Sequence, residues 1–217
     1  TIGILLPNGR RIFNVAIRTI QLHRGQAIYG VGGGITWDST WESEYREVHQ
    51  KAVVLYRKQP RFQLITTGKI SQKKLLFEKQ HLERLQKASR YFAFPFDQEV
   101  LRQKIEKEYQ SCDIRQDYRI RISLSKSGEI EIERQVLTPL SSSFCQAKLC
   151  QQEADLEQAF TYFKTTHRPH LTVGEQEIIY HTADGKLLET TIGNLVLKMD
   201  GKLYTPPVRL GILPGIY

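Results

Sequence analysis

A lysine in the second half of the sequence, Lys164, is the first residue whose type and position could support chemistry. It follows the apolar run FTYF, which predicts a strand, and precedes the polar residues TTHR. A lysine at the end of a strand can point into a cleft, where burial favours its neutral, nucleophilic amine. A single lysine is far more often a solvated surface group, so Lys164 by itself does not identify a site.

Glu189 and Arg84 could complete such a site for an anionic ligand that contains a ring. Glu189 precedes the turn TTIGN, and a carboxylate there could keep an aromatic ring nitrogen protonated. The turn could offer a phosphate the hydroxyl of Thr191 and backbone N–H groups near Ile192. Arg84 lies one turn after His81 on a predicted helix, where a guanidinium can bind phosphate through two hydrogen bonds. Individually, these residues are better explained as a hairpin acid and a surface arginine.

A second set of residues lies near the start of the chain, around the glycine run at 32–34. Glycine lets backbone N–H groups approach an anion closely. Glu44 and Glu47 follow on a predicted helix, and carboxylates three positions apart share one helix face. Their oxygen atoms suit Mg²⁺. A glycine run alone is weak evidence for a binding site.

The composition excludes several classes of protein. The 217 residues suffice for one domain or two small ones, and 40% hydrophobic and 25% charged residues are typical of a globular protein. No apolar run approaches the ~20 residues that cross a bilayer, and the N-terminus lacks the basic segment of a secretory signal. The net charge of +8 comes from scattered residues, which favours small anionic ligands over nucleic acid. Three cysteines without metal spacing favour a reducing, cytoplasmic location.

The elements that must position these residues can be predicted from periodicity and turn residues. Before Pro60, three strand-like segments precede one helix that Ser39 or Thr40 can cap. After Pro60, we expect strands at 62–67 and 69–77, helices at 78–94 and at 97–111 with Asp97 as N-cap, and a β-hairpin over 118–133. The polar stretch that follows predicts a linker, and the rest predicts a strand at 160–166 and four short strands over 177–208.

The order of four motifs resembles the fold type IV pyridoxal-phosphate enzymes over about residues 61–217. The motifs are HLERL, KTTHR, ETTIGNLVL and YTPPVRLGILPGIY, and within that class they are more similar to 4-amino-4-deoxychorismate lyase than to branched-chain or D-amino-acid aminotransferases. The resemblance implies that Lys164 binds the cofactor and that Glu189 pairs with its ring nitrogen. It implies that Arg168 could meet a substrate carboxylate. The residues implied to hold the cofactor phosphate are Arg84, Thr191, Ile192, Gly211 and Ile212.

The first 59 residues resemble the C-terminal end of chorismate-using enzymes, in particular component I of aminodeoxychorismate synthase. The resemblance is carried by FNVAIRT followed by GVGGGITWDSTWESEYREVHQKA. It implies that Arg18, Gly33 and Gly34 contact the substrate and that Glu47, with Glu44, binds Mg²⁺. The two resemblances together imply a fusion of consecutive enzymes of 4-aminobenzoate and folate synthesis, acting on chorismate and aminodeoxychorismate. They also imply a homodimer and a glutamine amidotransferase subunit as partner of the intact synthase.

The predicted fold is therefore α+β. Residues 1–59 are expected to be the end of a chorismate-binding domain with an incomplete synthase site, and 60–135 the small subdomain of a lyase. Residues 136–153 are expected to be a linker, and 154–217 a larger, truncated cofactor-binding subdomain. The interval between Lys164 and Glu189 looks short for this family. Three alternatives stay open: a class IV aminotransferase, an inactive fragment and, least favoured, a basic nucleic-acid module.

Overall fold

The computed structural model describes residues 2–14, 18–56, 58, 60–138, 144–152, 158–172, 174 and 176–217. The chain divides into two compact units, Thr1–Gln59 and Pro60–Tyr217. Both units mix helices and strands, which confirms the predicted α+β class. Within the described residues no helix combines the length and the apolar character that crossing a membrane requires.

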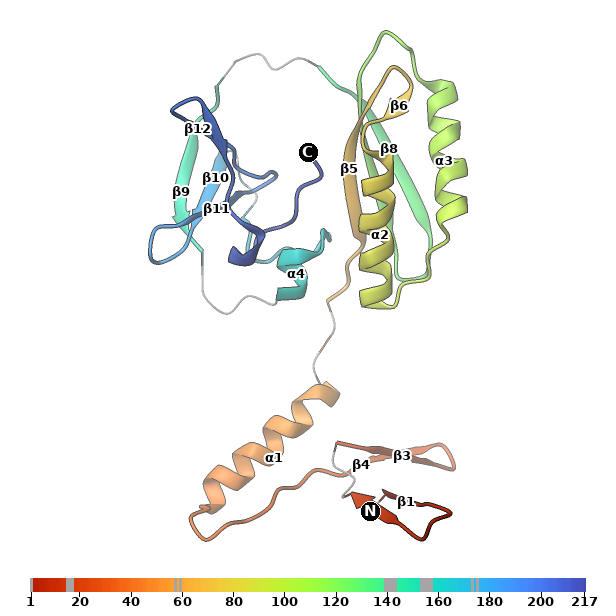
Figure 1. The fold of residues 1–217 in the computed structure, drawn as a ribbon, viewed down its shortest axis with the longest axis vertical. Coiled ribbons are helices and arrows are strands. Elements are labelled where there is room, and N and C mark those ends of the chain that lie inside the picture. The colour runs from red at the N-terminus through yellow and green to blue at the C-terminus, as the bar shows by residue number, and fades with distance from the viewer. Residues whose placement is uncertain are drawn as a thin grey trace. The chain divides into compact units, whose positions relative to one another are not determined.

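The first unit consists of two β-hairpins followed by one helix (Figure 1). Strand β1 (Ile2–Leu5) pairs with β2 (Arg11–Asn14), and β3 (Ile20–His23) pairs with β4 (Gln26–Tyr29), both antiparallel. Helix α1 spans Trp41–Tyr56. The prediction of strands followed by one helix is confirmed, but in the described residues four strands precede the helix instead of three. The second expected strand is divided, because Arg11–Asn14 and Ile20–His23 belong to two separate hairpins.

The second unit is built around a four-stranded antiparallel sheet in the order β6-β5-β7-β8. The strands span Leu64–Ser71 (β5), Lys74–Leu75 (β6), Tyr118–Leu124 (β7) and Ile130–Val136 (β8). Alternate residues of β5 are buried, as expected for a strand with one face on the core. The register places Thr66 opposite Ile122, and Ile122 opposite Ile132.

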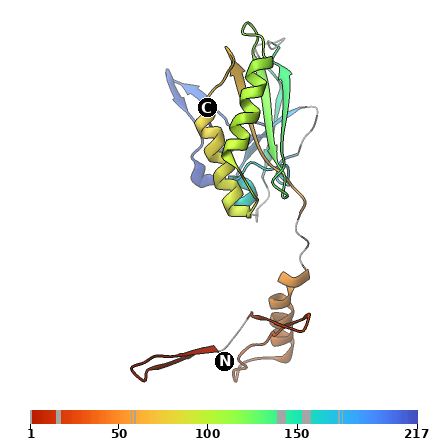
Figure 2. The same cartoon turned by 90° about the vertical axis from the view of Figure 1, so that its right-hand side faces the viewer.

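Helices α2 (Glu78–Phe92) and α3 (Gln98–Ser111) cover one face of this sheet (Figures 1 and 2). Their apolar stripes, including Leu82, Leu85 and Leu101, are fully buried with the isoleucines of β7. The Asp97 side chain accepts hydrogen bonds from the backbone N–H groups of Glu99 and Val100, which confirms its predicted role as the N-cap of α3.

A close approach between β5 and α2 makes Gly68 necessary. A Cβ atom at Gly68 would lie 2.7 Å from Nε2 of His81 and 2.6 Å from Cδ1 of Leu75. We therefore expect the Gly68→Ala substitution to lower the free energy of unfolding by about 1–3 kcal/mol through overpacking. Urea denaturation would measure the loss. The matched control is Gly174→Ala, where no atom among the described parts of the chain lies within 4 Å of the added Cβ; equal effects of both substitutions would contradict the packing argument.

The remaining elements of the second unit form a smaller sheet and a hairpin. Strands β9 (Ala147–Gln151), β10 (Glu177–His181) and β11 (Leu187–Thr190) form a sheet in the order β11-β10-β9, with β9 parallel to β10. The short strands β12 (Leu197–Met199) and β13 (Lys202–Tyr204) pair with each other, and a 3₁₀ turn η1 spans Val208–Leu210.

Two local predictions are wrong in this region. The segment 136–153, expected to be a linker, contains strand β9. The expected strand before Lys164 is instead helix α4 (Gln158–Tyr162). In α4, Phe160 is buried and its ring packs edge-on against Phe62 at 5.2 Å between centroids, so packing overrides the strand propensity of the aromatic residues.

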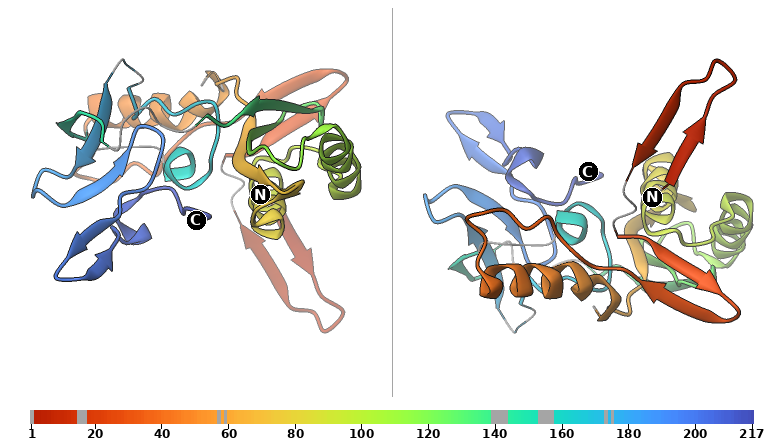
Figure 3. Two further views of the ribbon diagram at one scale, coloured as in Figure 1. Left: turned by 90° about the horizontal axis from the view of Figure 1, so that it is seen from above. Right: turned by 90° about the horizontal axis from the view of Figure 1, so that it is seen from below.

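The C-terminal segment returns to the first strand and helix of this unit (Figure 3). The backbone N–H of Lys69 on β5 donates to the hydroxyl of Tyr217 at 3.0 Å. The Tyr217 ring packs edge-on against Phe77, which immediately precedes α2. The segment 211–217 therefore lies beside β5 and α2, where Arg84 is located.

Candidate functional site

The backbone around Lys164 is attached to the start of β5. The carbonyl of Lys164 accepts a hydrogen bond from Ile65 N–H at 2.9 Å, and Thr166 N–H donates to the carbonyl of Gln63 at 2.9 Å. Thr165 forms an antiparallel bridge with Leu64. Lys164 thus lies at the edge of the sheet despite the preceding helix, and its position does not depend on a flexible loop.

The Lys164 amine lies in a partly buried, electropositive environment. Burial, followed by the positive charges of Arg168 and Arg84, lowers the pKa of Lys164 from 10.5 to about 8. Glu189 acts in the opposite direction, and Arg119 adds a smaller lowering effect. At a pH near 8 about half of the amine is therefore neutral, which is the form that attacks a carbonyl or accepts a proton.

Glu189 on β11 is a buried carboxylate held from two segments. It is 2% exposed. Its Oε1 accepts hydrogen bonds from Nη2 of Arg168 at 3.1 Å and from the backbone N–H of Leu213 at 3.3 Å. A buried charge is tolerated when it is paired and hydrogen-bonded in this way. Glu189 could thus face a protonated ring nitrogen without leaving its position.

Arg84 projects from α2 to the C-terminal segment. Its Nη2 donates to the backbone carbonyl of Pro214. Burial, together with the positive charge of Arg168, lowers the pKa of Arg84 to about 10. Three cationic side chains, Lys164, Arg84 and Arg168, therefore share one region with a single buried carboxylate, Glu189, among the groups described. This excess of positive charge suits an anion such as a phosphate.

The turn after Glu189 differs from its predicted role. Thr191 is held on β10: its N–H donates to the Ile178 carbonyl at 3.1 Å, and its Oγ1 accepts from the Ile178 N–H at 3.3 Å. The N–H of Ile192 donates to the carboxylate of Glu177 at 3.3 Å, and the Ile192 side chain is 77% exposed. A carboxylate occupying this N–H leaves it unsuited to phosphate, so the expectation for Ile192 is not supported by this arrangement.

Gly211 and Ile212 have structural roles in the described chain. Gly211 adopts a left-handed conformation with φ of 85° and ends η1 through a hydrogen bond from its N–H to the Val208 carbonyl. Ile212 is buried beside Leu171 and Leu188. Neither observation assigns a phosphate contact to these two residues.

The residues that sequence reasoning missed lie just after them, in the motif LPGIY. Leu213 donates its N–H to Glu189, and Pro214 accepts from Arg84. Asn194 Nδ2 donates to the Leu213 carbonyl at 2.8 Å, and a Cβ on Gly215 would lie 2.5 Å from Asn194 Oδ1. The motif LPGIY was the one sequence feature that could have pointed to these residues. Their contacts are made by backbone groups, so their side-chain types do not reveal them.

His81, predicted to lie on the helix that carries Arg84, is buried in a way that the sequence did not indicate. It is 1% exposed, and its Nδ1 is 2.6 Å from Oγ1 of Thr66. Its Nε2 is buried and makes no hydrogen bond within the part of the chain that the structure describes. Burial, followed by the positive charges of Arg84 and Lys164, lowers the pKa of His81 to about 4. His81 is therefore neutral at physiological pH.

The neutral state of His81 predicts acid destabilisation. Since its folded-state pKa of about 4 lies below the unfolded value of 6.5, the unfolded chain binds more protons between these values, and the free energy of unfolding falls as the pH drops from about 6.5 to about 4. His170, whose pKa is also lowered to about 4, acts in the same direction. Urea denaturation across this range should show a shallower pH dependence for His81→Gln than for the parent chain. An unchanged dependence would contradict the assignment.

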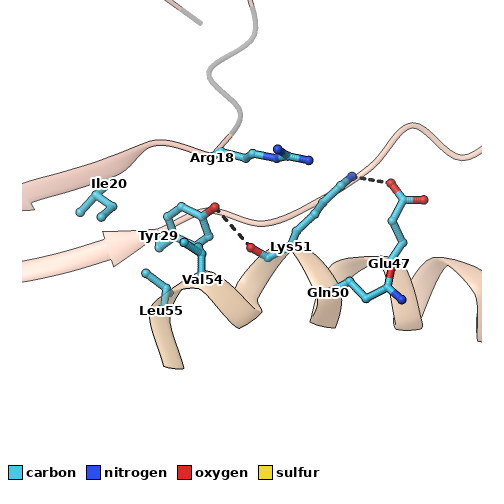
Figure 4. A pocket seen from close by; sticks show the side chains of 8 residues that line it. All are labelled: Arg18, Ile20, Tyr29, Glu47, Gln50, Lys51, Val54 and Leu55. Atoms are coloured by element: carbon cyan, nitrogen blue, oxygen red, sulfur yellow. Dashed lines mark hydrogen bonds and ion pairs between the residues drawn. The ribbon is translucent and has the colours of Figure 1, made fainter. Parts of the chain in front are cut away.

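The first unit contains a pocket of about 700 Å³ lined by Arg18, Tyr29, Glu47 and Lys51 with apolar neighbours (Figure 4). The Lys51 amine forms an ion pair with Oε1 of Glu47 at 2.5 Å and donates to the Gly32 carbonyl at 2.9 Å. These contacts attach the glycine run to α1. The structure thus brings Arg18 and Glu47 to one pocket, and it adds Lys51, which sequence reasoning did not single out.

The acids of α1 do not fit a Mg²⁺ site as they are arranged. Glu47 is paired with Lys51, and Oε1 of Glu44 accepts a hydrogen bond from Ser39 at 2.7 Å. A Cβ on Gly33 would lie 3.2 Å from Glu44 and 3.6 Å from Glu47, whereas no atom of the described residues lies within 4 Å of one on Gly34. In the described ranges no group of three or more His, Cys, Asp and Glu residues could hold a metal ion.

Two family comparisons match almost the whole chain. Residues 63–217 match the model of amino-transferase class IV, and residues 1–57 match that of the chorismate binding enzymes. The boundary between the two matches coincides closely with the division between the two compact units after residue 59. No curated protein matches the chain.

Solved structures share the fold at low sequence identity. A protein from Mesorhizobium loti, proposed to be an amino-acid aminotransferase, is 23% identical, with a TM-score of 0.58 over 71% of this chain and 79% of its own. A protein from Haemophilus somnus, proposed to be a 4-amino-4-deoxychorismate lyase, is 20% identical, with a TM-score of 0.54 over 73% of this chain and 81% of its own. A hypothetical aminotransferase from Mycobacterium tuberculosis in a PLP-bound form is 18% identical, with a TM-score of 0.57 over 71% and 64%. At these identities the likeness establishes the fold alone.

Proposed function

The chain belongs to the class IV amino-transferase family, and from this premise we propose that it eliminates pyruvate from 4-amino-4-deoxychorismate to give 4-aminobenzoate, with pyridoxal phosphate as cofactor. One observation carries the choice of reaction: the same chain contains a segment that matches the chorismate binding enzymes. A chorismate-derived substrate is a natural consequence of that fusion. Solved relatives proposed to be 4-amino-4-deoxychorismate lyases share the fold.

The residues around Lys164 fit this cofactor in their chemistry. Lys164 offers a partly buried amine whose lowered pKa makes the neutral form accessible near neutral pH. Glu189 offers a buried carboxylate for a protonated ring nitrogen, and Arg84 offers a guanidinium for the phosphate. When bound, pyridoxal phosphate supplies an electron sink for the electron pair that deprotonation at the amine-bearing carbon releases.

The residues of the chain would then hold the reacting groups and move the protons. Lys164 would remove the proton from the amine-bearing carbon of the substrate as general base. The bond between the ring and the enolpyruvyl oxygen breaks, the ring becomes aromatic, and the departing enol takes up one proton to become pyruvate. Lys164, protonated in the first step, would return that proton. Glu189 would keep the ring nitrogen protonated throughout, because its own charge is stabilised by Leu213 N–H and Arg168.

The test is a product assay that separates the lyase from an aminotransferase. We expect the protein, incubated with pyridoxal phosphate and 4-amino-4-deoxychorismate, to release pyruvate and 4-aminobenzoate in equal amounts. An aminotransferase would instead move the amino group to a keto acid and release no pyruvate. A colourless protein that forms neither product would indicate an inactive fragment.

The first unit supports a narrower proposal. The pocket with Arg18 and Lys51 would bind a carboxylate of chorismate or of a related acid, and no metal-dependent step is assigned to it.

Homodimerisation of the second unit and binding of a glutamine amidotransferase subunit are further proposals from the family resemblance. Light scattering of the purified protein would test the dimer directly.

A further inference from the structure

The guanidinium of Arg168 forms an ion pair with the side chain of Glu189. Arg168 lies four residues after Lys164, and its Nη2 donates to Oε1 of Glu189 at 3.1 Å. Both side chains are largely buried, at 13% and 3% exposure. Removing one partner of a buried ion pair leaves an uncompensated charge, so such a pair is costly to break. A substrate carboxylate would have to compete with Glu189 for this guanidinium.

The Glu189 carboxylate depends on Arg168 for its charge balance. Its second donor, the Leu213 N–H at 3.3 Å, is neutral and binds the same oxygen atom. Salt bridges of Glu189 within the described residues involve Arg168 alone. Burial, followed by the positive charge of Arg168, lowers the pKa values of Lys164 and Arg84. Arg168 is therefore close enough to both cations to act on their charge, and it contacts the buried acid Glu189 directly.

We propose that Arg168 is a positioning residue: its ion pair holds the Glu189 carboxylate in a fixed orientation, and it acts through Glu189 rather than by binding a carboxylate of the substrate. This inference rests on the proposed function, because it assigns how the acid opposite the cofactor ring is held. It also departs from the expectation that Arg168 meets the substrate. The alternative is that Arg168 binds a substrate carboxylate through its Nε. This atom is buried and makes no hydrogen bond to any described residue.

A double-mutant cycle on the full chain loaded with pyridoxal phosphate tests the proposal. The variants are Arg168→Gln, Glu189→Gln and the double substitution, with Arg168→Lys as the conservative variant and the exposed Arg115→Gln as control. If Arg168 acts through Glu189, Arg168→Gln lowers kcat about tenfold or more and leaves KM within about twofold. In the Glu189→Gln background the same substitution has little further effect, because interacting residues are not additive. Arg168→Lys restores part of kcat.

The opposite pattern would overturn the proposal. If Arg168 binds a substrate carboxylate, Arg168→Gln raises KM by about tenfold or more, in the Glu189→Gln background as well. Should Arg168→Gln not fold, Arg168→Lys decides: a lowered kcat at unchanged KM supports the proposal, and a raised KM opposes it.

A readout that needs no turnover separates this inference from the proposed reaction. In the cofactor-free protein, the reaction rate of Lys164 with an amine reagent is followed by peptide mass spectrometry against pH. Glu189→Gln should make Lys164 more reactive below pH 8 and Arg168→Gln less reactive, since the two charges shift its pKa in opposite directions. If Arg168 and Glu189 are paired, the double variant should differ from the sum of the two single variants, both in the reactivity of Lys164 and in the free energy of unfolding. If the single effects add up in both measurements, the pairing is overturned, whether or not the protein releases pyruvate.

Discussion

Replacing Lys164 by alanine is expected to abolish covalent cofactor binding and to reduce pyruvate release by at least about a thousandfold. The reason is that Lys164 would serve both as the attachment point and as the base, and the other lysines of the described chain are not placed beside Glu189 in the same buried setting. The fold should persist, because the contacts that place Lys164 are made by the backbone of Ile65 and Thr166.

The measurement is the visible absorbance of the protein after addition of pyridoxal phosphate and exhaustive dialysis, followed by the product assay. The matched control is Lys186→Ala, because the Lys186 side chain forms an exposed ion pair with Asp184 on a turn. A Lys164→Ala protein that keeps the visible band after dialysis would refute the assignment of Lys164. A parent protein without the band would refute the proposed cofactor.

Replacing Glu189 by glutamine is expected to lower both stability and activity. Glutamine keeps the shape but removes the charge that compensates Arg168 in a buried setting. Breaking a buried ion pair from one side costs about 3–5 kcal/mol, so the free energy of unfolding of the cofactor-free protein should fall by about that amount. Activity should fall as well, since a neutral amide does not keep the ring nitrogen protonated.

Urea denaturation of the cofactor-free protein measures the first effect, and the product assay measures the second. Glu177→Gln is the control on the neighbouring strand, where the carboxylate accepts a hydrogen bond from the exposed N–H of Ile192. A Glu189→Gln protein within about 0.5 kcal/mol of the parent would show that the pair contributes little to stability.

Local sequence patterns predicted the elements whose contacts are made between residues close together in the sequence. The antiparallel strands β7 and β8 and the helix with its cap at Asp97 were readable, because alternation, turn residues and caps are encoded within a few positions. Strand β9 was not, since it pairs in parallel with β10 across more than 20 residues and carries no apolar alternation of its own. Helix α4 was predicted to be a strand because its aromatic residues favour strands. The contact of Phe160 with Phe62, which stabilises the helix, lies far away in the sequence.

The candidate site shows the same division. Lys164, Glu189 and Arg84 were identifiable from their residue types together with the family resemblance, and the structure brings them into one region. The roles of Leu213 and Pro214 were not, because only their backbone groups act and any residue type supplies those. Arg168 was identified, but its partner is set by burial of both side chains, which a spacing of 21 positions does not reveal.

The contacts of the C-terminal segment have a consequence for the order in which the protein forms during synthesis. Arg84 binds a carbonyl 130 positions later, and Lys69 binds a hydroxyl 148 positions later. The sheet, α2 and α3 can pair as soon as residue 136 is available, whereas the site needs Leu213, Pro214 and Tyr217. Contacts of such long sequence separation form slowly. A ribosome-bound chain would therefore carry a folded scaffold before it carries a site, and cofactor capture would follow the folding of that scaffold.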